Sequence, residues 1–180
     1  MSYPWYLYAN TLPYWQDFMS IVNEVDNTLN TYFNEDTSPD VMRWLANVVY
    51  NDNQKLQALS PVNVNPDVLD LASQYVECYL ALSKFLNDAA SFKDNCAAYE
   101  QNSQDDFLSG FVAGFVGGFL GGLLGDSDDS VGYIPAGSEG NYSNALSEMQ
   151  DMLSSNWEQI SNYYQGLIER TEQLRMQLFP

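Results

Sequence analysis

An uncharged stretch of 19 residues, 107–125 (FLSGFVAGFVGGFLGGLLG), most constrains how this chain can fold. It repeats every four residues, with Phe or Leu first, Leu or Val second, and small residues third and fourth. Residues four apart lie on one face of a helix, so the small residues form two adjacent ridges beside a bulky apolar ridge. We call this pattern the glycine zipper. The residues predicted to make its contacts are Gly110, Gly114, Gly117, Gly118, Gly121, Gly122, Phe107, Phe111, Phe115 and Phe119.

One interpretation of the glycine zipper is that it spans or enters a membrane. As a helix, residues 107–124 are about 27 Å long, close to the thickness of the bilayer hydrocarbon. Small residues at four-residue spacing also let helices approach closely within lipid. Against this interpretation, nearly half of the stretch is Gly, Ala or Ser, and both flanks are acidic. Neither Lys nor Arg is present to orient a span, and neither Trp nor Tyr marks its ends.

Two further interpretations place the zipper against protein. It can be buried in a soluble scaffold, where a second copy of the same stretch covers the glycines and builds a homo-oligomer or filament. It can also be sheltered in a helical bundle and released into a membrane, as in α-helical pore-forming proteins, an analogy of architecture alone. We expect a membrane-associated, self-associating protein, with the soluble scaffold and the pore-forming type as alternatives. A lipid bilayer is the other expected partner.

The charge composition argues against several other functions. Six basic residues face 24 acidic ones, for a net charge of −18, which makes nucleic acid a poor partner. The chain has no histidine, the commonest general base and transition-metal ligand. No Walker loop or paired cysteine motif occurs. We therefore expect no enzyme activity, no small-molecule substrate, no cofactor and no metal site. The N-terminus lacks the features of a signal peptide, so we expect membrane association without secretion, or a soluble cytoplasmic protein.

Three helices are expected before the zipper. The first begins near Pro13, and the second begins after Ser38, an N-cap residue followed by proline and an acid. Asn65 repeats that signal for the third, which runs to about Gln101. Asn51-Asp52-Asn53 favours a kink in the second helix. The expected buried positions are Trp15, Phe18, Val22, Val25, Leu29 and Tyr32; Val41 or Met42, Leu45, Val48 or Val49, Leu56 and Leu59; and Leu69, Ala72, Val76, Tyr79, Leu82, Leu86 and Ala89 or Ala90.

The two cysteines, Cys78 and Cys96, lie 18 residues apart on the third helix. A continuous helix would separate them by about 27 Å, which forbids a disulfide. A turn near Asn87-Asp88 would instead bring them together. Because neither glycine nor proline occurs there, we favour a continuous helix with two reduced thiols.

After the zipper, residues 126–141 form an acidic linker rich in Gly and Ser. Asp126, Asp128 and Ser130 partly match a calcium loop, but Val131 and Gly137 replace its required Gly and Glu, so we expect a solvated loop. Residues 142–180 then form a long amphipathic helix whose partner should be the third helix. Its seam alternates three and four residues through Leu146, Met149, Leu153, Trp157, Ile160, Tyr164, Leu167, Thr171, Leu174 and Leu178.

The predicted fold is therefore all-α: a long-helix bundle or coiled-coil hairpin of about five helices with the zipper at its centre. We expect one domain overall. Its parts are a helical bundle region over 1–106, the zipper helix over 107–125, the linker over 126–141 and the C-terminal helix over 142–180.

Overall fold

Long helices make up most of the part of the chain that the computed structural model describes, which is residues 8–34, 36–100 and 139–179. Four helices lie in these ranges: α1 (Thr11–Tyr32), α2 (Pro39–Gln57), α3 (Pro66–Glu100) and α5 (Glu139–Leu178). The expected all-α bundle is confirmed at this level. The expected count of about five helices is not, because residues 107–125 lie outside the described ranges.

The expected start signals operate at α2 and α3. The Ser38 hydroxyl accepts a hydrogen bond from the Val41 amide at 3.4 Å, and proline occupies the first turn. At α3, the Asn65 side chain accepts a hydrogen bond from the Asp67 amide at 2.8 Å. These caps satisfy amides that have no partner inside the helix. The first helix begins at Thr11, two residues before the predicted start.

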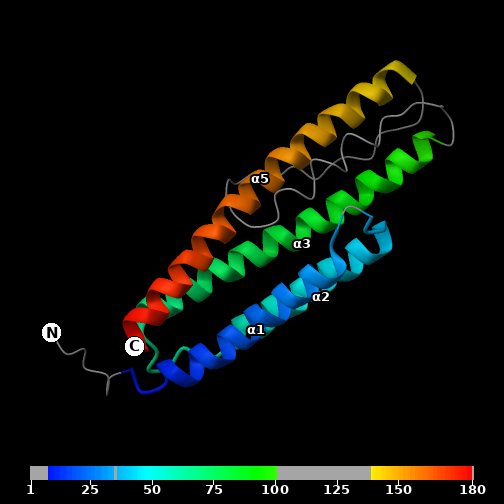
Figure 1. The fold of residues 1–180 in the computed structure, drawn as a ribbon. Coiled ribbons are helices and arrows are strands. Elements are labelled where there is room, and N and C mark those ends of the chain that lie inside the picture. Colours follow the sequence, from blue (N-terminus) through cyan, green and yellow to red (C-terminus); the bar gives the residue numbers. More distant parts are fainter. Residues whose placement is uncertain (1–7, 35, 101–138, 180) are drawn as a thin grey trace.

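The helix α3 lies between α5 on one side and α1 and α2 on the other (Figure 1). It runs antiparallel to α5, because Asp70 pairs with Arg170 near the start of α3 while the Phe85 ring packs on Trp157 farther along. The predicted pairing of the third and last helices is confirmed. The end of α3 and the beginning of α5 consequently lie at the same end of the bundle (Figure 1).

The start of α1 and the end of α5 meet at the opposite end of the bundle. Trp15, in the first turns of α1, packs on Phe179, which follows α5, with ring centroids 5.5 Å apart. The backbone amide of Asn10 donates to the Asn63 carbonyl at 3.1 Å, which ties the start of α1 to the α2–α3 connection. Asn63 itself has a positive φ of 58°, a left-handed conformation that asparagine tolerates well in a turn.

The seam of α5 is confirmed almost completely, as its predicted residues from Leu146 to Leu174 are buried and Leu178 is partly buried. The seam of α1 is also confirmed except at its last position. Tyr32 is 51% exposed and packs edge-to-face on the exposed Trp44 ring of α2. The prediction for Tyr32 was wrong because α1 ends at this residue, so no neighbouring turn covers it.

The buried face of α3 differs from the predicted stripe. Leu69 and Val76 are only partly buried, because α3 packs on two sides and its buried surface is wider than one seam. Its buried residues also include both cysteines, which form no disulfide with each other, as the continuous helix predicts. The buried residues of α3 are Val68, Leu71, Ala72, Tyr75, Cys78, Tyr79, Leu82, Ser83, Phe85, Leu86, Ala89, Ala90, Phe92 and Cys96.

The middle of α2 continues as helix through the expected weak point. Asp52 and Asn53 are both buried, whereas we expected this polar run to disturb the helix. Lys55 reaches back to Asp52 at 2.6 Å and across to Glu24 of α1 at 3.2 Å, so these polar side chains join α2 to α1. Of the alternatives left open on α2, Met42 and Val49 are the buried members. At the other long helix, α5 begins at Glu139, three residues before the predicted start.

Candidate functional site: a polar layer inside the bundle

The ten predicted zipper residues lie outside the described ranges, so their contacts remain a prediction. The structure does place the points to which the zipper is attached. The 38 residues 101–138 connect Glu100, at the end of α3, to Glu139, at the beginning of α5. These two points lie at the end of the bundle away from the start of α1 and the end of α5 (Figure 1).

A layer of polar side chains crosses the bundle interior between α1, α3 and α5. We call it the polar layer; it consists of Asp26, Tyr75, Cys78, Tyr79, Tyr164 and Thr171. The Tyr164 hydroxyl donates a hydrogen bond to the half-buried Asp26 carboxylate, which joins α5 to α1. The hydroxyl oxygens of Tyr75 and Thr171 lie 3.1 Å apart, which joins α3 to α5.

The tyrosine rings of the polar layer pack on one another. Tyr75 contacts Tyr79 and Tyr164 in edge-to-face arrangements, each with centroids 5.8 Å apart. Phe18 of α1 packs edge-to-face on Tyr75 at 5.3 Å. The Tyr79 hydroxyl lies next to that of Tyr164 without forming a well-aligned hydrogen bond. Each ring thus contributes apolar area to the core while its hydroxyl faces the polar layer.

Burial determines the protonation states in this layer. It raises the pKa of Cys78 to about 12 and the pKa values of Tyr75, Tyr79 and Tyr164 well above their ordinary range. These groups are therefore neutral at physiological pH and unsuited to act as nucleophiles or general bases. Burial also raises the pKa of Asp26, and the hydrogen bond from Tyr164 partly opposes that shift.

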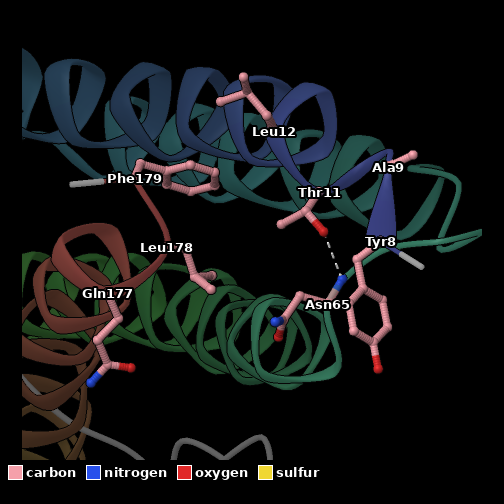
Figure 2. A pocket seen from close by; sticks show the side chains of 8 residues that line it. All are labelled: Tyr8, Ala9, Thr11, Leu12, Asn65, Gln177, Leu178 and Phe179. Carbon is pink, nitrogen blue, oxygen red and sulfur yellow. Dashed lines mark hydrogen bonds between the residues drawn. The ribbon is translucent and has the colours of Figure 1, made fainter. Parts of the chain in front are cut away.

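A pocket opens at the end of the bundle where the start of α1 meets the end of α5 (Figure 2). Its volume is about 340 Å³. Two of its polar side chains are already engaged in the fold, because the Thr11 hydroxyl accepts a hydrogen bond from the Asn65 amide at 2.9 Å and the Asn65 side chain caps α3. The residues that line it are Tyr8, Ala9, Thr11, Leu12, Asn65, Gln177, Leu178 and Phe179.

Within the described part of the chain, no three His, Cys, Asp or Glu side chains gather as they would around a metal ion. Among the same residues, no helix combines the length and the apolar character that a membrane crossing needs. The partial calcium-loop match at Asp126, Asp128 and Ser130 lies outside the described ranges.

The sequence patterns identified only part of the polar layer. Tyr164, Thr171 and Tyr79 were predicted as seam positions, but their hydroxyl partners were not. Asp26 directly follows the seam residue Val25, and one helix's periodicity does not show which side chain of another helix it meets. The one signal available in the sequence for the polar layer was an acidic residue next to a seam position, in a chain whose seams contain several tyrosines.

The fold and this layer define an antiparallel helical bundle whose apolar core contains a tyrosine-rich polar layer. No protein-family description, curated protein or solved structure matches the chain. Its function must therefore be argued from its own residues.

Proposed function

We propose that this is a non-enzymatic helical protein that associates with a membrane and with copies of itself through the glycine zipper. The observation that carries the proposal is the unbroken four-residue repeat over 107–125, free of charge throughout. The structure supports it indirectly, because the four described helices bury their own seams against one another. The partner of the glycine zipper would then be another copy of the protein or lipid.

Self-association is supported by the cost of the glycines. The stretch contains seven of them, and each destabilises a helix interior by about 0.5–1 kcal/mol relative to alanine. The sum is several kcal/mol. Close backbone contact along the small ridges would offset that cost, since glycine lets two helices approach more closely than any other residue.

The antiparallel packing of α3 and α5 limits how the zipper meets a bilayer. Because α3 ends and α5 begins at the same end of the bundle, the 38-residue connection must leave and return on one side. A complete crossing by 107–124 would force residues 126–138 back through the hydrocarbon. That segment contains Asp126, Asp128 and Asp129, and an acid at the bilayer centre costs about 2.5–3.5 kcal/mol. With α3 and α5 packed together, the zipper therefore enters the bilayer from one side without crossing it.

Two alternatives keep the same zipper contact. In a soluble scaffold, the small ridges would pack only against other copies, and the acidic flanks of the zipper favour this form. In a pore-forming type of protein, the zipper would cross the bilayer completely, which requires α5 to separate from α3. The two forms therefore differ in the contact between α3 and α5. The contact is kept when the zipper only enters the bilayer, and it is lost when a pore forms.

Membrane association is tested by fractionation. The protein is expressed, sedimented with membranes, and extracted first with carbonate and then with detergent. We expect recovery in the membrane fraction and release by detergent. Complete recovery as a monodisperse soluble protein without detergent would refute the membrane part of the proposal.

Self-association is tested by replacing Gly114 and Gly118 together with leucine, which fills one small ridge. We expect a lower oligomeric mass by light scattering in detergent. The matched control is Gly166→Leu on α5, an exposed position where an added Cβ would meet no atom within 4 Å. An unchanged mass in the zipper variant would show that this ridge is not the contact face.

A further inference from the structure

Asp26 occupies an unusual position for an acid in this chain. It follows the seam residue Val25 on α1 and is half-buried where α1, α3 and α5 meet. Tyr164 of α5 donates its hydroxyl hydrogen to the Asp26 carboxylate. The titratable groups that α3 presents to it are Tyr75, Cys78 and Tyr79, and these are uncharged at neutral pH.

No cation balances the Asp26 charge. On α2, Lys55 contacts α1 at Glu24 and is also held by Asp52 of its own helix. The chain has six basic residues in all, and each has a partner elsewhere. Five of them are in direct contact, Arg43 with Asp94, Lys55 with Asp52, Lys93 with the Thr37 carbonyl, Arg170 with Asp70, and Arg175 with Glu172. Lys84 acts electrostatically on Asp88 of the same helix.

We propose that Asp26 is a pH-sensitive contact whose protonation strengthens the docking of α5 onto α1 and α3. A protonated carboxyl keeps the oxygen that accepts from Tyr164 and gains a donor of its own. It also loses the desolvated charge, which has no cation nearby to stabilise it. The contact therefore persists in both forms, but the neutral form fits the bundle interior better.

The direction of the effect follows from linkage. Burial raises the pKa of Asp26 in the folded protein above its value in the unfolded chain. The stabilisation of the neutral form is fully present below the unfolded pKa and is lost as the pH rises through the folded pKa. The α5 contact is consequently weaker at neutral pH than in mild acid, opposite to an aspartate that is paired with a cation.

The test compares the wild-type protein with Asp26→Asn, which fixes the side chain in a neutral form. Urea unfolding is followed from about pH 3 to about pH 8, a range that begins below the ordinary aspartate pKa of about 3.9. We expect the wild-type midpoint to fall more with rising pH than the midpoint of Asp26→Asn. Asp17→Asn, at an exposed position of the same helix, should follow the wild type. Parallel curves for the wild type and Asp26→Asn would overturn the proposal.

Two measurements on the wild-type protein keep the test independent of how the variant folds. Amide hydrogen exchange of α5 around Tyr164, corrected for the intrinsic pH effect, should be slower in mild acid than at neutral pH. The Asp26 carboxyl carbon should titrate by NMR above the ordinary range for aspartate. A carboxyl that titrates within or below that range would overturn the proposal.

Discussion

The contact between Tyr75 and Thr171 allows a prediction about which of two conservative substitutions is more costly. The Thr171 hydroxyl donates its only hydrogen to the Leu167 carbonyl at 2.7 Å. The hydrogen between the two hydroxyls, whose oxygens lie 3.1 Å apart, must therefore come from Tyr75. Tyr75 is the donor, Thr171 is the acceptor, and both side chains are buried.

The two substitutions leave different groups behind. Tyr75→Phe removes the donor and leaves only an unused acceptor site on Thr171, so we expect a loss of about 0.5–1.5 kcal/mol in the free energy of unfolding. Thr171→Val removes the acceptor and leaves the buried Tyr75 hydroxyl without a partner, so we expect a larger loss of about 1–3 kcal/mol. The double variant replaces both partners with apolar groups of similar shape and should lose less than Thr171→Val alone.

The measurement is urea unfolding of the wild type, both single variants and the double variant, with unchanged denaturant dependence as the check for a common transition. The double-mutant cycle then gives the coupling between the two side chains. A greater cost for Tyr75→Phe than for Thr171→Val would refute the assigned hydrogen-bond direction. Strictly additive costs would show that the two hydroxyls do not interact.

Three further predictions concern other parts of the bundle. Ser38→Ala should lower the free energy of unfolding by about 0.5–1 kcal/mol, because the cap on α2 is a long hydrogen bond; a loss of more than about 2 kcal/mol in urea unfolding would contradict this. Cys78 and Cys96 should react with a thiol reagent only when the protein unfolds, since both are buried and burial raises the pKa of Cys78 to about 12; rapid absorbance change in the native protein would contradict it. Asn53→Leu should raise the free energy of unfolding by about 1–3 kcal/mol, because its buried amide has no hydrogen-bond partner in the structure; a lower urea midpoint would show that solution supplies such partners.

How accurately the sequence predicts the buried residues of a helix depends on how many of its sides are covered by other helices. α5 presents one narrow seam to its neighbours, and the spacing of three and four residues predicted that seam from Leu146 to Leu174. α3 packs on two sides, so its buried residues do not follow a single stripe, and Val76 was misplaced for that reason. Periodicity describes one face at a time and cannot show how many faces have partners.

The polar layer was beyond the reach of periodicity for a different reason. Asp26 meets Tyr164 across 138 positions of sequence, and their pairing depends on which helices become neighbours. Likewise, Asp52 and Asn53 looked like a weak point of α2, although Lys55 and Glu24 help to accommodate Asp52 between α1 and α2. Local helix propensity describes what a segment favours alone, and tertiary contacts overrode it here.

The contact between Trp15 and Phe179 makes the two ends of the bundle different from each other. The start of α1 and the end of α5 lie at one end of helices that are about 50 Å long, and the connection that carries the zipper is attached at the other end. A fluorophore or affinity tag placed near the start of α1 or the end of α5 would therefore be remote from the points where that connection is attached. If two molecules associate end to end through their zippers, their terminal labels lie too far apart for efficient energy transfer, whereas side-by-side association brings them close. Terminal labelling can thus report the geometry of an assembly without touching the surface that forms it.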